Sequence, residues 1–416
     1  MTQTVLDICK RARAASYLTA QLSGEQKNVA LCHMANALEA NAEKVLVANQ
    51  LDVQAAKKKG MKTALLDRLA LDRKKIGEMA KQLREVSALS EPVGSIEKTW
   101  TRPNGLVIGM LRVPMGVVGV IYESRPNVTS DAAGICLKSG NAVILRGGSD
   151  AINSNVAIGE VLSNALTGTG VPADAIQVLA NPERAAAEEL MGMREYIDVL
   201  IPRGGADLIR TVVEKSRIPV IETGTGNCHV YVAEDADQVQ AIPIIVNAKC
   251  QRPGVCNAAE KLLVDAAIAK AFLPKAAAAL MELGVEIRGD EATAKIVEGV
   301  KPATEQDWYT EYLDLIIGVK VVKDIDEAIA HINKYGSHHS DSILTASFDK
   351  ALKFIKQVDS AAVYWNASTR FTDGNQFGLG SEIGISNQKL HARGPLGAQH
   401  LTTIKYFVLG RGHVRE

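Results

Sequence analysis

The feature that most constrains the fold of this chain is a set of four short apolar runs. Each run follows or precedes a stretch with helical periodicity. They are AVILR at 142–146, IQVLA at 176–180, IDVLI at 197–201 and IPVIE at 218–222. The segments between them, SNVAIGEVLSNAL, ERAAAEELMGM and GADLIRTVVEK, are each long enough to cross from one parallel strand to the next. The alternation predicts an α/β fold with a doubly wound, Rossmann-type parallel sheet.

The rest of the chain divides around this block. Residues 1 to about 90 repeat apolar side chains at spacings of three and four, which predicts a helical cap, and β texture follows from about residue 97. A second α/β block begins at HVYVA and ends at AAVYWNA, and a Gly-, Asn- and Ser-rich loop at 370–395 precedes a β-like tail, HLTTIKYFVL. We expect three parts, which are 1–228 with a β excursion at 97–121, 229–366 and 367–416.

The charged side chains balance, with 47 Lys and Arg against 47 Asp and Glu. A chain without net charge has no field to hold nucleic acid phosphates or an anionic membrane surface. The N-terminal segment becomes charged at Asp7, and no window approaches the length of uncharged apolar residues that spans a bilayer. We expect a cytoplasmic protein that acts on a small molecule, with no nucleic acid or membrane partner.

Polar turns follow three of the predicted strands. They are Arg146, Gly147, Gly148 and Ser149, then Asn181 and Pro182, then Pro202, Arg203, Gly204 and Gly205. Parallel sheets bind nucleotides at such strand ends, but neither GxGxxG nor GxxxxGK[ST] occurs, and Gly pairs also serve packing alone. Nucleotide binding and packing therefore both remain open on the turns alone. No CxxC or HExxH is present, so no metal site is expected.

The segment NAKCQRPGVCNA at 247–258 is the richest in chemistry. Cys256 follows a turn, Pro253-Gly254-Val255, that can present its side chain to a cleft, and Arg252 nearby favours the thiolate. Cys250 falls on the preceding predicted helix. The alternative for either cysteine is a buried small hydrophobic residue.

Five fragments, YESRPNVTSDAAGICLKSGNAVILRGG, IPRGGADLI, ETGTGNCHVYV, QRPGVCNA and LHARGPLG, resemble the aldehyde dehydrogenase superfamily and, within it, the branch that reduces an acyl phosphate. The resemblance implies an aldehyde dehydrogenase-like fold, in which 1–228 binds the cofactor, 229–366 is catalytic and 367–416 supplies a substrate loop and an oligomerisation strand. It places Cys256 at the nucleophile position and Glu222 at the general-base position. It assigns IPRGGADLI to the pyrophosphate, AVILRGGSDA to the adenosine ribose, and Glu311 to the cofactor site.

The reaction implied by this resemblance is the NADPH-dependent reduction of L-glutamyl 5-phosphate to L-glutamate 5-semialdehyde, through a cysteine thioester, in L-proline biosynthesis. Asn127 in SRPNVT matches the amide that stabilises the oxyanion, although an Asn after Pro also ends ordinary turns. Glu222 would activate water in a hydrolytic relative, whereas in a reductase it would only tune Cys256 or shape the pocket.

Cofactor and substrate residues follow from the same match. Relatives that use NAD often carry Glu where this chain has Ser149, and Arg146 with a small hydroxyl suits the 2′-phosphate of NADPH. The loop 370–395 matches the loop over the substrate, where Ser381, Glu382 and Ser386 would meet the glutamyl ammonium or carboxylate. Arg252 would assist the departing phosphate.

The resemblance also implies partners and alternatives. Strands near 97–121 and 400–409 match a projecting hairpin that joins a partner's sheet, which predicts a homodimer or higher homo-oligomer. An unstable acyl phosphate favours a complex with the kinase that makes it, glutamate 5-kinase. The alternatives are a hydrolytic NAD(P)-dependent aldehyde dehydrogenase and a non-catalytic nucleotide-binding or assembly protein.

Overall fold

The computed structural model describes residues 4–415 and contains two compact units. Unit 1 comprises the described residues up to Glu222, Gly378–Gly384 and the described residues from Leu396 onward, and unit 2 comprises Thr223–Phe377 and Ile385–Pro395. The first stretch of unit 1 thus ends at Glu222, where the sequence analysis expects a boundary at 228. The part expected at 367–416 is divided, because its last strand pairs with a strand of unit 1, with Thr402 opposite Pro114.

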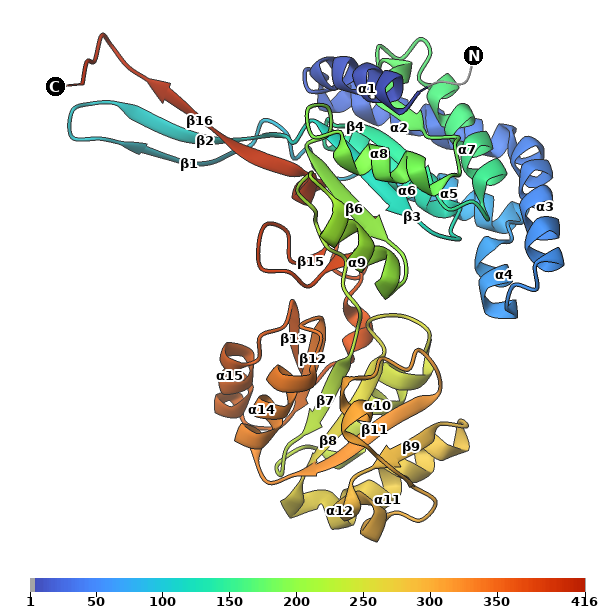
Figure 1. Ribbon diagram of the computed structural model, residues 1–416. Coiled ribbons are helices and arrows are strands. Elements are labelled where there is room, and N and C mark those ends of the chain that lie inside the picture. The colour runs from blue at the N-terminus through green and yellow to red at the C-terminus, as the bar shows by residue number, and fades with distance from the viewer. Residues whose placement is uncertain (1–3, 416) are drawn as a thin grey trace. The chain divides into compact units, whose positions relative to one another are not determined.

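Unit 1 begins with the expected helical region (Figure 1). Its helices are α1 (Val5–Thr19), α2 (Gly24–Ala40), α3 (Ala42–Lys58), α4 (Thr63–Leu69) and α5 (Arg73–Ser87). The Ser23 side chain accepts from the Gln26 N–H and the Gln26 side chain accepts from the Ser23 N–H, so a capping box starts α2. The Asp72 carboxylate accepts from Lys75 N–H and so caps the N-terminus of α5.

The sheet of unit 1 is parallel, with strand order β5-β4-β3-β6. Its elements are β3 (Val117–Tyr122), α6 (Asn127–Lys138), β4 (Ala142–Gly147), α7 (Ile152–Ala165), η1 (Ala173–Ala175), β5 (Ile176–Val178), α8 (Arg184–Gly192), β6 (Val199–Arg203) and α9 (Ala206–Lys215). All six residues of β3 are buried, as in a strand covered on both faces.

Two expectations about this sheet are corrected. The excursion predicted at 97–121 is too long, because Val117–Tyr122 is the central strand β3. The run at 218–222 is not a strand. It makes only a bridge between Val220 and Leu200, since Pro219 has no N–H to donate to a ladder.

A three-stranded antiparallel sheet of order β1-β2-β16 also belongs to unit 1 (Figure 1). Its strands are β1 (Ile96–Thr101), β2 (Val107–Pro114) and β16 (Thr402–Leu409), and the short helix η3 (Ala398–Leu401) leads into β16. The expected return of the tail to β structure is confirmed. Most of β1 and β16 is exposed or half-buried, unlike β3.

Unit 2 contains a seven-stranded parallel sheet of order β10-β9-β11-β8-β7-β12-β13. Its strands are β7 (Cys228–Val232), β8 (Ala259–Asp265), β9 (Glu286–Gly289), β10 (Lys301–Pro302), β11 (Ile316–Val322), β12 (Ser340–Leu344) and β13 (Ala362–Trp365), with a small pair β14 (Ile385–Ser386) and β15 (Gly394–Pro395). Its helices are α10 (Gln238–Cys250), α11 (Ala266–Glu282), α12 (Glu291–Ile296), α13 (Glu305–Tyr309), α14 (Ile325–Tyr335), α15 (Phe348–Gln357) and η2 (Thr369–Phe371).

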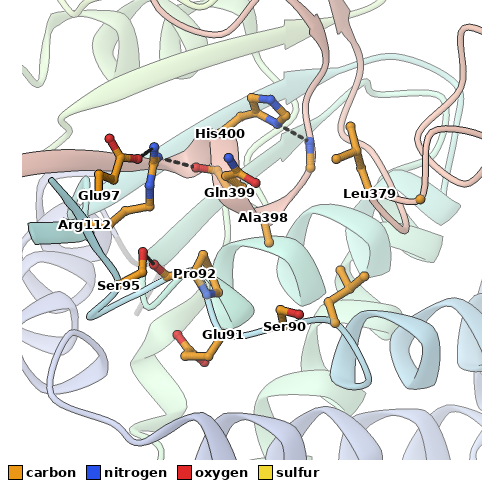
Figure 2. Close-up of a pocket in the computed structure, with 13 residues that line it drawn as sticks. Ser90, Glu91, Pro92, Ser95, Glu97, Arg112, Leu379, Ala398, Gln399 and His400 are labelled. Atoms are coloured by element: carbon orange, nitrogen blue, oxygen red, sulfur yellow. Dashed lines mark hydrogen bonds and ion pairs between the residues drawn. The ribbon is translucent and has the colours of Figure 1, made fainter.

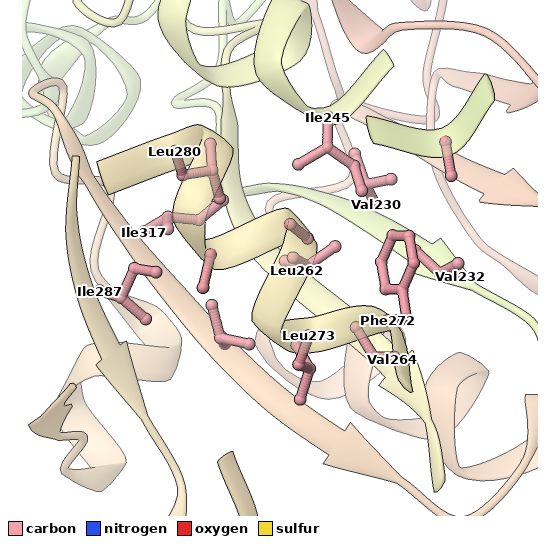
Figure 3. Close-up of a cluster of buried hydrophobic side chains, with 14 of the residues drawn as sticks. Val230, Val232, Ile245, Leu262, Val264, Phe272, Leu273, Leu280, Ile287 and Ile317 are labelled. Atoms are coloured by element: carbon pink, nitrogen blue, oxygen red, sulfur yellow. The ribbon is translucent and has the colours of Figure 1, made fainter. Parts of the chain in front are cut away.

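Alternating strand residues build two cores, one on each face of this sheet. Figure 3 shows Phe272 of α11 beside Val232 and Val264, and Leu280 of the same helix beside Ile317 of β11, in a core that also takes Ile245 of α10. The intervening residues face the other way, where Tyr231 and Leu263 pack with α14 and α15. The second expected α/β block is confirmed. Among the described residues, no helix is long and apolar enough to cross a membrane.

Candidate functional site

Three polar turns of unit 1 meet at one edge of its sheet. The register pairs Tyr122 of β3 with Gly147 of β4 on one side and with Arg203 of β6 on the other. The three strands therefore end level, and the turns at 123–126, 148–151 and 204–205 follow at the same edge. The expected cofactor residues Arg146–Ser149 and Pro202–Gly205 lie together here, beside Asn127.

Glu123 connects two of these turns. Its Oε2 accepts a hydrogen bond from Gly205 N–H at 3.0 Å, just ahead of α9. A Cβ on Gly204 would lie 2.5 Å from the same oxygen, so a side chain there would displace the Glu123 carboxylate. Ser124, at φ 39°, donates its hydroxyl to Asp150 and so joins the β3 turn to the β4 turn. The turn at 204–205 is thus held from β3, and the Gly205 amide already has a partner.

Arg146 lies at the end of β4 and is half-buried. Its Nη2 donates to the carbonyl oxygens of Pro182 at 2.9 Å and Glu183 at 3.3 Å, which fixes the guanidinium over the turn after β5. Its Nε is buried with no hydrogen-bond partner among the described residues. Burial lowers the pKa of this guanidinium, and Asp150 and Glu123 oppose that effect. The side chain is therefore fixed in place, with its buried Nε–H left without a partner among the described residues.

Asn127 is the first residue of α6, and its amide is oriented by the same helix. Its Nδ2 donates to Oδ2 of Asp131 at 2.9 Å, one turn further on. The other carboxylate oxygen of Asp131 is buried and has no partner among the described residues. Burial raises the pKa of Asp131 to about 7, against the effects of Asn127 and Arg203.

Cys256 lies in unit 2, in the segment between α10 and β8. It is half-buried, and its backbone oxygen accepts from the Cys228 thiol at 3.1 Å. Gly226 packs against the same oxygen, because a Cβ on Gly226 would lie 1.5 Å from it. Burial raises the pKa of Cys228, so this thiol keeps its proton and donates it. Cys250 ends α10, and burial raises its pKa also.

Glu311 lies close to the Cys256 turn. Its Oε1 accepts from Gly226 N–H at 2.7 Å, so Gly226 touches Cys256 on one side and Glu311 on the other. Burial raises the pKa of Glu311, and His339 and Lys261 act in the opposite direction. Lys261 is itself buried, donates to Asn227 and to Thr310, and has its pKa lowered by burial to about 7.

The other expected site residues are distributed over both units. Glu222 is the last residue of this part of unit 1 and is half-buried. Ser381 and Glu382 belong to unit 1, and the Ser381 hydroxyl is buried without a hydrogen-bond partner among the described residues. Ser386 and Arg252 belong to unit 2. Ser386 is fully buried in β14 and Arg252 is exposed.

A cavity of about 380 Å³ lies elsewhere in unit 1, and none of the expected site residues lines it. Figure 2 shows Arg112 between Glu97 and the Gln399 carbonyl. The ring Nδ1 of His400 accepts from Gly397 N–H. Glu91 at its floor is paired with Lys27 at 2.5 Å. Since none of the expected site residues lines this cavity, we keep the turns of unit 1 as candidate cofactor residues and Cys256 of unit 2 as the candidate nucleophile. No group of acidic, His and Cys side chains among the described residues could hold a metal ion.

The sequence did not identify Glu123, Asp131, Cys228 or Gly226 as candidate site residues. Asp131 carries a signal, since it lies four residues after Asn127 in a predicted helix and so on the same face. The other three act through contacts between segments far apart in the chain, such as Glu123 with Gly205.

Several known proteins are similar to this chain in sequence and in structure. The model of the aldehyde dehydrogenase family matches residues 2–298. The chain is 59% identical over 407 residues to gamma-glutamyl phosphate reductase of Thermoanaerobacter pseudethanolicus, covering 98% of each chain. It is similar to the crystal structure of gamma-glutamyl phosphate reductase from Thermotoga maritima, with a TM-score of 0.97, 51% identity and 100% of each chain covered.

A more distant structure shows how widely the fold is shared. The acetylating aldehyde dehydrogenase of Geobacillus thermoglucosidasius matches with a TM-score of 0.72 at 19% identity, over 99% of this chain and 97% of that one. The expected resemblance and the expected fold class are confirmed.

Proposed function

Because the chain belongs to the aldehyde dehydrogenase family and is therefore an oxidoreductase acting on an aldehyde group, we propose that it reduces L-glutamyl 5-phosphate to L-glutamate 5-semialdehyde with NADPH, in L-proline biosynthesis. The observation that carries the proposal is the 59% identity, over 98% of the chain, to a relative named for this reductase. The residues of the candidate site suit each step of that chemistry.

The first step belongs to Cys256. Its thiolate attacks the acyl carbonyl, the bond from carbon to the phosphate oxygen breaks, phosphate departs with the electron pair, and a thioester remains on Sγ. The turn that carries the nucleophile is held by Cys228 and by the close approach of Gly226. Cys250, at the end of a helix, has no part in the proposal.

The negative oxygen of each tetrahedral intermediate needs a fixed donor. We assign this role to the Asn127 amide, whose orientation is set by Asp131. No water attacks the thioester in this reaction, so Glu222 is assigned a supporting role in tuning Cys256 or shaping the pocket. After the thioester has been reduced, the thiohemiacetal oxygen re-forms the carbonyl as the carbon–sulfur bond breaks, so the aldehyde leaves and the electron pair returns to Sγ as the thiolate.

The strand ends of unit 1 fit a phosphorylated dinucleotide. Glycines stand where side chains would collide, and Arg146 has one buried donor without a partner. We assign Arg146–Ser149 to the phosphorylated ribose, Pro202–Gly205 to the pyrophosphate, and Glu311 to the same cofactor. NADPH, when bound, supplies the hydride that reduces the thioester. The absence of an acid at Ser149 favours NADPH over NADH.

Substrate and partners complete the proposal. Arg252 is assigned to the departing phosphate, and Ser381, Glu382 and Ser386 to the glutamyl ammonium and carboxylate. The exposed strands β1 and β16 support a homodimer or higher homo-oligomer. A complex with glutamate 5-kinase would protect the labile acyl phosphate.

The test follows the reverse reaction, in which glutamate 5-semialdehyde reduces NADP. We expect the reaction to require inorganic phosphate and to proceed with a higher kcat/KM for NADP than for NAD. Cys256→Ala should abolish it, and the matched control Cys250→Ala should remain active. Reduction of NADP without phosphate would instead identify a hydrolytic aldehyde dehydrogenase.

A further inference from the structure

Arg370 of η2 reaches the segment that carries the proposed nucleophile. Its Nε donates to the side-chain oxygen of Gln251 at 2.8 Å, and Gln251 opens the turn that ends at Cys256. Residues 370 and 251 are far apart in the chain, so only the folding of unit 2 brings them together. The guanidinium of Arg370 is thereby fixed beside the turn.

Two hydrogen bonds join the segment 369–372 to Asn257, the residue that follows Cys256. The Asn257 side chain donates to the carbonyl oxygen of Thr372 at 2.8 Å, and the Thr369 hydroxyl donates to the carbonyl of Asn257 at 2.7 Å. Thr369, Thr372 and Asn257 are all buried. Cys256 thus lies between Gln251 and Asn257, and both of these residues are hydrogen-bonded to the segment 369–372.

Two arginines, Arg252 and Arg370, lie close to each other at this segment. Neither Arg252 nor Arg370 forms an ion pair among the described residues. Burial and the nearby charge of Arg252 both lower the pKa of the Arg370 guanidinium. Burial is the larger cause, while Cys256 and Asp373 act in the opposite direction. Asp373 is turned to its own loop, where it accepts from the N–H groups of Asn375 and Gln376.

We propose that Arg370, together with Arg252, forms a phosphate site beside Cys256 that binds the phosphoryl group of the acyl phosphate. The inference rests on the proposed function and adds a residue to it. When the Cys256 thiolate adds to the carbonyl and the carbon–oxygen bond breaks, the electron pair stays on the phosphate oxygen. Two guanidinium groups next to that oxygen stabilise the charge, and in the reverse direction they hold the incoming phosphate.

The test uses the whole protein and inorganic phosphate as the probe. Alkylation of Cys256 by iodoacetamide is followed with increasing phosphate, which reports phosphate binding without turnover. We expect phosphate to slow alkylation of the native protein, and Arg370→Met to raise the half-protecting concentration at least tenfold. The phosphate KM of the reverse reaction should rise in parallel, with KM for the semialdehyde and for NADP within twofold of the native values.

Two further variants make the result specific. Lys275→Met removes one positive charge from the exposed face of α11 and should leave phosphate protection unchanged. Arg370→Lys keeps the charge but cannot make the paired bonds of a guanidinium, so phosphate protection should weaken in this variant too. It replaces Arg370→Met in the test if the Met variant melts at a lower temperature than the native protein. Unchanged phosphate protection in a folded Arg370 variant overturns the inference. Phosphate-independent turnover of the native enzyme would instead overturn the proposed function.

Discussion

At the scale of single residues, the pair Asn127 and Asp131 shows how a helix can fix the amide that we propose as the oxyanion donor. The carboxylate uses one oxygen to hold Nδ2 and leaves the other buried without a partner among the described residues. A buried carboxylate in this position prefers its protonated form, and its pKa is raised to about 7. The native state therefore binds a proton that the unfolded chain releases above about pH 4.

This difference predicts a pH-dependent stability. Between about pH 4 and pH 7 the native protein binds more protons at Asp131 than the unfolded chain does, so the free energy of unfolding should fall as the pH rises. Asp131→Asn accepts the same hydrogen bond but cannot ionise. Its advantage over the native protein should grow between pH 5 and pH 8, by on the order of a few kcal/mol.

The measurement is urea unfolding of both proteins at the two pH values. The Asn127→Ala variant serves as the comparison for activity, where we expect a loss of roughly a hundred- to thousandfold against a much smaller loss for Asp131→Asn. A stability difference that does not change with pH would show that Asp131 is ionised in the native protein throughout.

At the scale of elements, the site depends on glycines that let two segments touch. Gly204 approaches the Glu123 carboxylate after β3, and Gly226, ahead of β7, approaches the backbone of Cys256. The nearest atom to a Cβ at Gly226 would be a backbone oxygen that cannot turn aside, so this contact requires glycine, whereas at Gly204 it would be the end of the Glu123 side chain. Each of the two glycines therefore lets a neighbouring segment pack against a turn to which we assign a function.

We expect Gly226→Ala to disable the enzyme. A methyl group there would lie 1.5 Å from the Cys256 carbonyl oxygen, so the turn must move and the Glu311 contact with it. Activity should fall at least a hundredfold, measured as phosphate-dependent reduction of NADP.

The control for this variant is Gly77→Ala. Gly77 lies in the middle of α5 with open space around its Cα, so the change should keep activity and stabilise the protein by roughly 0.5–1 kcal/mol. If Gly226→Ala retained native activity, the turn would tolerate displacement and the close approach would have no role in catalysis.

At the scale of the whole molecule, the sheet β1-β2-β16 leaves two edge strands and a row of apolar side chains in contact with solvent. In β16, Tyr406, Val408 and Leu409 are each more than half exposed. Exposed apolar edges of this kind are normally covered by another chain. We therefore expect a homo-oligomer built through this sheet.

Light scattering should give a mass that is a multiple of 44.5 kDa. Val408→Lys places a charge on the β16 edge and should shift the mass toward the monomer. Val239→Lys changes an exposed valine of α10, which is 82% exposed, and should leave the mass unchanged. A monomeric native protein would contradict the assignment of β16 to assembly.

The sequence by itself determined the class of fold and the positions of most strands and helices, and it singled out the segment that carries Cys256. These features are local, because periodicity and turn chemistry act between residues near one another in the chain. Cys256 could be singled out from its turn, and Arg146–Ser149 from their place after an apolar strand. The family resemblance supplied their roles.

Only the tertiary structure decided the rest. The apolar run at 218–222 resembles a strand locally, yet Pro219 and the actual neighbour β6 allow a single bridge. Val117–Tyr122 could be read as part of a hairpin until its pairing with β4 and β6 made it the centre of the parallel sheet. Arg370 and Gln251 meet across 119 positions, and no local pattern encodes such a contact, because it depends on how the whole of unit 2 packs.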